Sequence, residues 1–138
     1  MTKEELQHLY LDYLKEEGFK ASVDEEGDIE FKFEGDKYIL FVEEKDLEYF
    51  RIQSGYGFEF KTDEDKIKSL QVLNSVNYEY KLGKICVDID EELVIVETGF
   101  FLVKPDDFKL FFKRCLGIIQ GMISDFSDRV NEEEQSEE

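Results

Sequence analysis

The stretch that decides the fold spans residues 63–102 and reads DEDKIKSLQVLNSVNYEYKLGKICVDIDEELVIVETGFFL. Its first part has apolar residues at helical spacing, and its second part alternates apolar with polar residues as strands do. No linker rich in glycine and proline separates the two parts. We therefore predict a helix over residues 63–77, capped by Thr62 or Asp63, that leads directly into two strands of one α+β domain.

The two strands, over residues 84–89 and 92–102, predict their own pairing, because a turn at Asp90-Glu91 fixes which residues face each other. The expected pairs are Lys84 with Glu97, Ile85 with Val96 and Val87 with Val94. One face of this hairpin is apolar and belongs to the core. The reverse face also has an excess of apolar side chains, which are Cys86, Leu93 and Ile95.

The chain before this stretch predicts one helix and four short strands. Thr2 is a suitable N-cap, apolar residues then recur at helical spacing up to Leu14, and Gly18 is a stop signal. The alternating segments that follow are residues 19–24, 28–34, 37–43 and 48–54. We expect these segments to form antiparallel strands, because turn residues separate them.

A turn at Gly35-Asp36 joins two of these strands. A two-residue loop there places Phe31 opposite Leu40 on an apolar face. Ile39 and Phe41 then lie on the reverse face, where charged residues indicate water. This face of the sheet therefore has more apolar surface than solvent exposure alone explains.

The last helix is expected to begin at Pro105, which suits the first turn of a helix, and to run to about Val130. Its apolar stripe is wider than one sheet face requires, so the helix is either central or in contact with another subunit. The sequence thus predicts a two-layer α+β fold, α-β(3-4)-α-β(2)-α, in which helices pack on an antiparallel sheet. We expect one domain over residues 1–130 and a disordered acidic tail over residues 131–138.

Composition limits the classes of partner. The 138 residues include 35 acidic and 17 basic ones, for a net charge of −18. Without the five acids of residues 131–138 the net charge is still −13, so the folded part is acidic too. Such a chain repels phosphate backbones, and we expect no binding of nucleic acid. The acidity indicates either a basic partner surface or a requirement for solubility alone.

Residues that could carry chemistry are few. The only histidine, His8, lies in the first predicted helix, and no serine lies in a nucleophile motif. Acidic runs at residues 24–28 and 88–92 lack the spacing of calcium loops and are typical of hairpin turns. Cys86 and Cys115 have apolar neighbours, which indicates reduced core thiols; a disulfide between them is the alternative. We expect no catalytic residues, metal site or cofactor, and we expect a cytoplasmic protein without a membrane segment.

Two passages resemble a known family. Residues 18–35, which include the run VDEEGDIEFKFEG at 23–35, and the run LNSVN at 73–77 with the hairpin after it are similar to the YbjN-like family of bacterial sensory transduction regulators. The resemblance covers most of residues 1–128. It implies the fold of type III secretion chaperones, which are small, acidic, cytosolic proteins that form homodimers and hold a segment of an effector.

The resemblance implies a noncatalytic protein that binds other proteins. Our leading hypothesis is a cytoplasmic, homodimeric interaction or regulatory module, with partner-binding residues Ile39, Phe41, Leu93 and Ile95. A second interpretation is that a helix or a neighbouring subunit covers these residues and that no regulated partner exists. The alternative functions are a secretion-type chaperone and an enzyme of unrecognised class.

Overall fold

A computed structural model describes residues 1–136. The elements are α1 (Lys3–Glu16), β1 (Ala21–Val23), β2 (Ile29–Phe33), β3 (Asp36–Leu40), β4 (Tyr49–Gly57), α2 (Asp63–Glu79), β5 (Lys84–Asp88), β6 (Leu93–Phe101), the 3-10 turn η1 (Pro105–Asp107) and α3 (Phe108–Ser136). Four strands precede the second helix and two follow it, which confirms the predicted order.

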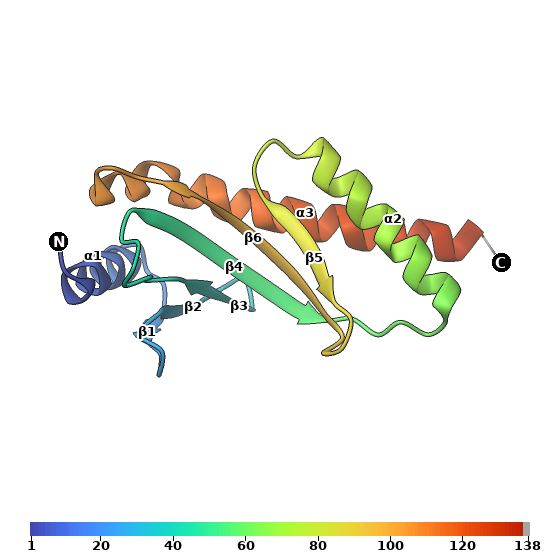
Figure 1. The fold of residues 1–138 in the computed structure, drawn as a ribbon, viewed down its shortest axis with the longest axis horizontal. Coiled ribbons are helices and arrows are strands. Elements are labelled where there is room, and N and C mark those ends of the chain that lie inside the picture. The colour runs from blue at the N-terminus through green and yellow to red at the C-terminus, as the bar shows by residue number, and fades with distance from the viewer. Residues whose placement is uncertain (137–138) are drawn as a thin grey trace.

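All six strands form one antiparallel sheet in the order β1-β2-β3-β4-β6-β5. In Figure 1, α3 runs behind β5 and β6, and it contacts both β4 and β6. The first helix packs on β1 and β2, and α2 packs on α3 and β5. The helices therefore form one layer and the sheet the other, as the two-layer α+β prediction requires.

Aromatic side chains join the two layers. Phe112 of α3 lies 5.5 Å from Tyr13 of α1 and 5.6 Å from Phe31 of β2, measured between ring centroids. Phe108 contacts Tyr10 of α1 in the same way, at 4.8 Å. These rings are buried and add apolar contact area to the core, and the two contacts between α1 and α3 also have the favourable edge-to-face geometry. The beginning of α3 is thereby fixed against both α1 and the sheet.

The predicted register is confirmed in one hairpin and wrong in the other. Strands β5 and β6 pair Lys84 with Glu97, Ile85 with Val96 and Val87 with Val94, as expected. In the β2–β3 hairpin the loop is Glu34-Gly35, and Phe31 faces Tyr38 instead of Leu40. Both loop residues have positive φ angles, 50° and 87°, which the tight hairpin turn needs. The shift is two residues, so each side chain keeps its predicted face.

Several element ends differ from the prediction. Helix α2 continues to Glu79 and strand β4 to Gly57. Pro105 begins the short turn η1, and α3 itself starts at Phe108. The same helix continues to Ser136, into the segment 131–138 for which we predict a disordered tail. Residues 137–138 lie outside the described residues, and the division into a domain at 1–130 and a tail stays a prediction.

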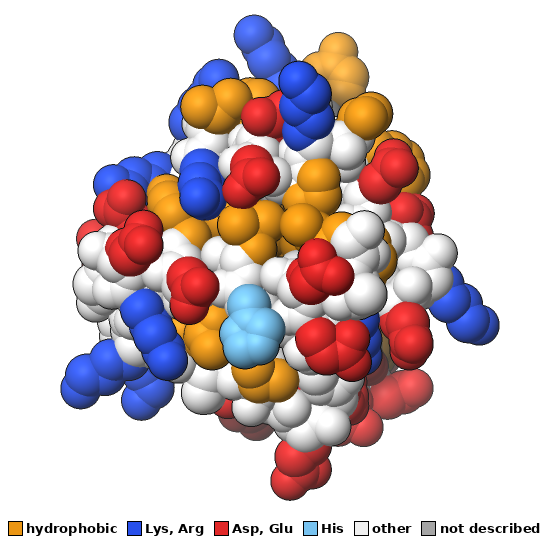
Figure 2. All heavy atoms as spheres, turned by 90° about the vertical axis from the view of Figure 1, so that its left-hand side faces the viewer, with side chains coloured by type: hydrophobic (Ala, Val, Ile, Leu, Met, Phe, Trp, Pro, Cys, Tyr) orange, Lys and Arg blue, Asp and Glu red, His pale blue; other side chains and the backbone are white. Residues whose placement is uncertain are grey.

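The surface at the N-terminal end of the molecule mixes apolar and charged groups. Figure 2 shows apolar side chains in the middle of this end, with acidic side chains around them. A shallow hollow here is lined by Met1, Leu47, Val103 and Pro105 together with three acidic residues of the β3–β4 connection. Val103 is 84% exposed, which is high for such a large apolar side chain.

Candidate functional site: the open face of the sheet

The face of the sheet opposite the helices carries the residues that sequence reasoning singled out. Along β4 and β6, a buried set that faces the helices alternates with a second set that is half-buried or exposed, except for the buried Glu97. The other set forms what we call the open face, because no further helix or strand of the described residues packs on it. Its two longest strands, β4 and β6, pair along nine positions and give it a long, continuous floor.

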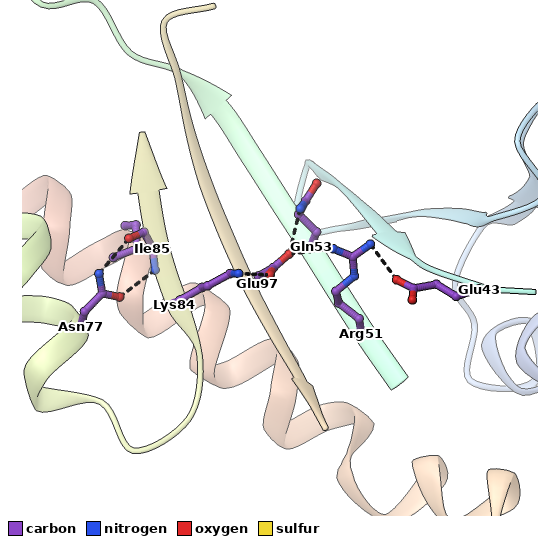
Figure 3. Close-up of polar contacts among 7 residues, drawn as sticks. All are labelled: Glu43, Arg51, Gln53, Asn77, Lys84, Ile85 and Glu97. Atoms are coloured by element: carbon purple, nitrogen blue, oxygen red, sulfur yellow. Dashed lines mark hydrogen bonds and ion pairs between the residues drawn. The ribbon is translucent and has the colours of Figure 1, made fainter. Parts of the chain in front are cut away.

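A buried carboxylate, Glu97, lies at the centre of the open face. Its residue is 7% exposed, and it accepts a hydrogen bond of 3.0 Å from Gln53 of β4. It also forms ion pairs with Lys84 of β5 at 2.8 Å and with Arg51 of β4 at 3.4 Å (Figure 3). The cross-strand pairs Gln53–Glu97 and Lys84–Glu97 bring these side chains together. Three strands are thus tied by one carboxylate.

The surroundings of Glu97 set its protonation. Burial by itself raises the pKa of this carboxyl, but hydrogen bonds from Lys84 and Gln53 and the charge of Arg51 outweigh burial, so the pKa lies below its ordinary value. The same contact acts on Lys84, whose pKa is raised first by its hydrogen bond with Glu97. At neutral pH the centre of the face is therefore an ionised cluster, which suits a structural role better than proton transfer.

Arg51 connects this cluster to an aromatic ring. Its guanidinium lies 3.0 Å from Glu43 and stacks over the ring of Phe41, 3.8 Å from the ring centroid (Figure 3 shows the ion pair). Cations are attracted to the faces of aromatic rings, and the contact also shields the ring from water. Phe41, one of the four predicted partner-binding residues, is thus partly covered by its own chain.

The other three predicted residues lie on two strands. Ile39 is half-buried on β3, beside Gln53. Leu93 is 37% exposed and Ile95 half-buried on β6, where they face Gly57 and Gly55 of β4. Glycines leave the floor next to Leu93 and Ile95 without side chains, so these two residues form a small apolar strip. The structure therefore gathers Leu93 with Ile95 and Ile39 with Phe41, as two pairs separated by β4.

The side chain of Asn77, on α2, forms hydrogen bonds with the outer edge of strand β5. The Asn77 side chain donates to the carbonyl oxygen of Ile85 at 2.9 Å and accepts from the Ile85 amide at 2.8 Å (Figure 3). These are the backbone groups that a further strand would use. From the sequence we placed Asn77 only at the end of the predicted helix and missed this role. The signal in the sequence was an amide side chain four residues after Leu73, and therefore on the same face of the predicted helix, seven residues before the strand predicted at residues 84–89.

Other titratable groups have structural partners. Asp24 accepts hydrogen bonds from the backbone amides of Glu26 and Asp28, and Asp88 accepts one from Glu91, so both acidic runs form turns as predicted. Cys115 is buried, as predicted, and burial raises the pKa of its thiol to about 11. Cys86 is exposed, so the prediction of a core position is wrong for this residue, although partial burial of its thiol still raises its pKa. Within residues 1–136 no group of three His, Cys, Asp or Glu side chains could hold a metal ion. No helix among them is long and apolar enough to cross a bilayer.

The chain is similar to a known protein family and to a solved structure. The YbjN family, described as "Putative bacterial sensory transduction regulator", matches residues 7–128. A solved structure described as "Crystal structure of YbjN, a putative transcription regulator from E. coli" is similar with a TM-score of 0.65 and 10% identity, over 83% of this chain and 85% of that chain. At this identity the likeness shows the fold alone. No curated protein matches the chain.

Proposed function

This chain belongs to the YbjN family, and we propose that it is a noncatalytic regulatory module that acts by binding a second protein chain, namely another copy of itself. The observation that carries the proposal is the open face, on which Leu93 and Ile95 remain accessible beside glycines of β4. Apolar strips with a polar surround are typical of interaction surfaces.

The polar cluster supports the same proposal. Glu97 and its partners lie next to the apolar strip, because Glu97 and Ile95 are on the same side of β6. A rigid, ionised centre beside an apolar strip gives a partner both area and a defined register. Free thiols at Cys86 and Cys115 suit a reducing compartment, and we propose that the protein acts in the cytoplasm.

The test is a double variant of the strip, Leu93→Asp with Ile95→Asp, measured by sedimentation velocity over a concentration series. We expect the unaltered protein to dimerise and the variant to remain a monomer with an unchanged circular dichroism spectrum, because two buried carboxylates at an interface oppose association. The matched control is Val23→Asp with Ile89→Asp, which adds the same charge at exposed apolar positions outside the strip. It should dimerise normally.

A dimer that survives the strip variant would remove the open face from the proposal. A protein that is a monomer at every concentration would contradict self-association. A tagged pull-down followed by intact-complex mass spectrometry then identifies any other chain. One stoichiometric partner that is lost with the strip variant would assign an adaptor or chaperone role to the same face.

A further inference from the structure

A large apolar cavity lies at the edge of the sheet, away from the strip at Leu93 and Ile95. It has a volume of about 840 Å³ and is formed by the α2–β5 connection, the end of β6 and the first half of α3. It arises because β5 is shorter than β6. Pairing ends at Lys84 with Glu97, so the last residues of β6 have no outer neighbour strand. The volume lies within the range of about 300–1,000 Å³ that is usual for sites of small molecules.

The walls of the cavity are mainly apolar and well supported. Phe100 of β6 and Phe111 of α3 meet edge to face at 5.4 Å between ring centroids. Cys115 and Ile118 continue the wall along α3, and Leu82 closes it from the α2–β5 connection. Cys115 is buried, and burial keeps its thiol neutral at physiological pH, so it acts here as an apolar surface. The cavity therefore offers a largely apolar surface to an apolar chain.

The rim of the cavity has a charge opposite to that of the molecule. Lys81 and Arg114 line it and are exposed. In the part of the chain that the structure describes, neither forms an ion pair. The one acid of the lining, Glu79, is already paired with Arg129. In a chain of net charge −18, two uncompensated cations at the mouth of an apolar cavity select for an anionic group.

We propose that this cavity binds an amphiphilic carboxylate of the fatty-acid class. The alkyl chain lies between Phe100, Phe111 and Ile118, and the carboxylate lies at the rim with Lys81 and Arg114. Arg114 can hold a carboxylate through two parallel hydrogen bonds, and Lys81 adds a second charge. This site is separate from the proposed dimer strip at Leu93 and Ile95, so its test does not depend on self-association.

Isothermal titration of the full chain with dodecanoate, below its micelle concentration, tests the proposal. We expect one molecule bound per chain, with affinity rising about threefold to fourfold for each methylene added from octanoate to dodecanoate. The double variant Lys81→Gln with Arg114→Gln should bind about tenfold more weakly or worse, because it removes hydrogen bonds to a charged group. The control pair Lys45→Gln with Lys61→Gln makes the same charge change outside the cavity and should bind within about twofold.

Two further probes make the outcome decisive. A cationic amphiphile of equal chain length should bind much more weakly than dodecanoate, since the rim repels it. Because the chain has no tryptophan, Leu82→Trp places a single tryptophan at the cavity wall, and dodecanoate should change the tryptophan emission. Equal binding of both amphiphiles, unchanged affinity in the double variant, or no saturable binding at any chain length would overturn the proposal. Saturable binding of an apolar peptide in place of dodecanoate would overturn it too.

Discussion

At the residue scale, Glu97 shows how a buried charge is kept ionised. Its carboxylate has lost most of its water, and Lys84, Gln53 and Arg51 replace that water with donors and positive charge. A buried carboxylate without such partners would carry a raised pKa instead of a lowered one. Removal of the carboxylate therefore affects three strands at once, although Lys84 itself is largely exposed.

Glu97→Gln should lower the free energy of unfolding by about 1–2 kcal/mol, because it removes a charged acceptor while leaving Arg51 half-buried. The exposure of Lys84 limits the loss. Urea unfolding at neutral pH measures the change. Glu59→Gln, at an exposed position between β4 and α2, is the control and should change stability by less than about 0.5 kcal/mol.

The pH dependence of these variants gives a second readout. The pKa of Glu97 is lower in the folded chain than in the unfolded chain, so its contribution is complete above the ordinary carboxyl pKa of about 4.3 and is lost as the pH falls through the lowered folded value. The stability difference between the original chain and Glu97→Gln should therefore shrink in acid. A difference that stays constant down to acid pH would show that packing, and not the charge, explains the loss.

At the element scale, the β5 strand depends on a helix for its outer hydrogen bonds. Asn77→Ala should destabilise the fold by about 1–2 kcal/mol, because it leaves both backbone groups of Ile85 without their partner. Hydrogen exchange should show faster exchange of the Ile85 amide. Asn74→Ala, at an exposed position one turn earlier on α2, is the control and should leave that amide protected.

Some features of the helices and strands can be predicted from the sequence, and others cannot. The β5–β6 register could be predicted, because the turn at Asp90-Glu91 and the pair Lys84–Glu97 agree. The β2–β3 register was wrong by two residues, because Glu34 adopts a left-handed conformation that nonglycine residues rarely favour. The order of helices and strands followed from periodicity, whereas the end of α3 did not, since glutamate and glutamine are good helix formers.

At the scale of the whole molecule, the candidate site could be predicted only in part. Alternation placed Ile39, Phe41, Leu93 and Ile95 on the face away from the core. The contact between Arg51 and Glu97 spans 46 residues and depends on the pairing of β4 with β6, which no local pattern contains. The cavity likewise requires the ends of three elements to meet. Local sequence patterns therefore predict which face of the sheet a residue occupies, whereas side-chain clusters and cavities depend on how the strands and helices are assembled.

The net charge of the whole molecule affects its stability, and salt tests this effect. With 35 acidic and 17 basic residues, the folded state repels itself, so adding sodium chloride should raise the melting temperature. The variant Glu25→Gln with Glu26→Gln, at exposed positions in the β1–β2 turn, should respond less to salt. A melting temperature that falls with salt would show that ion pairs such as those of Glu97 outweigh the overall repulsion.

The hydrogen bonds of the Asn77 side chain also affect how the protein associates at high concentration. A bare sheet edge can recruit the same edge of a neighbouring molecule and grow into fibres. Here the β5 margin is occupied by Asn77 at Ile85, and the opposite margin is the three-residue strand β1. At high concentration these two margins therefore offer little template for ordered aggregation, which favours contacts through the broad surfaces of the sheet instead.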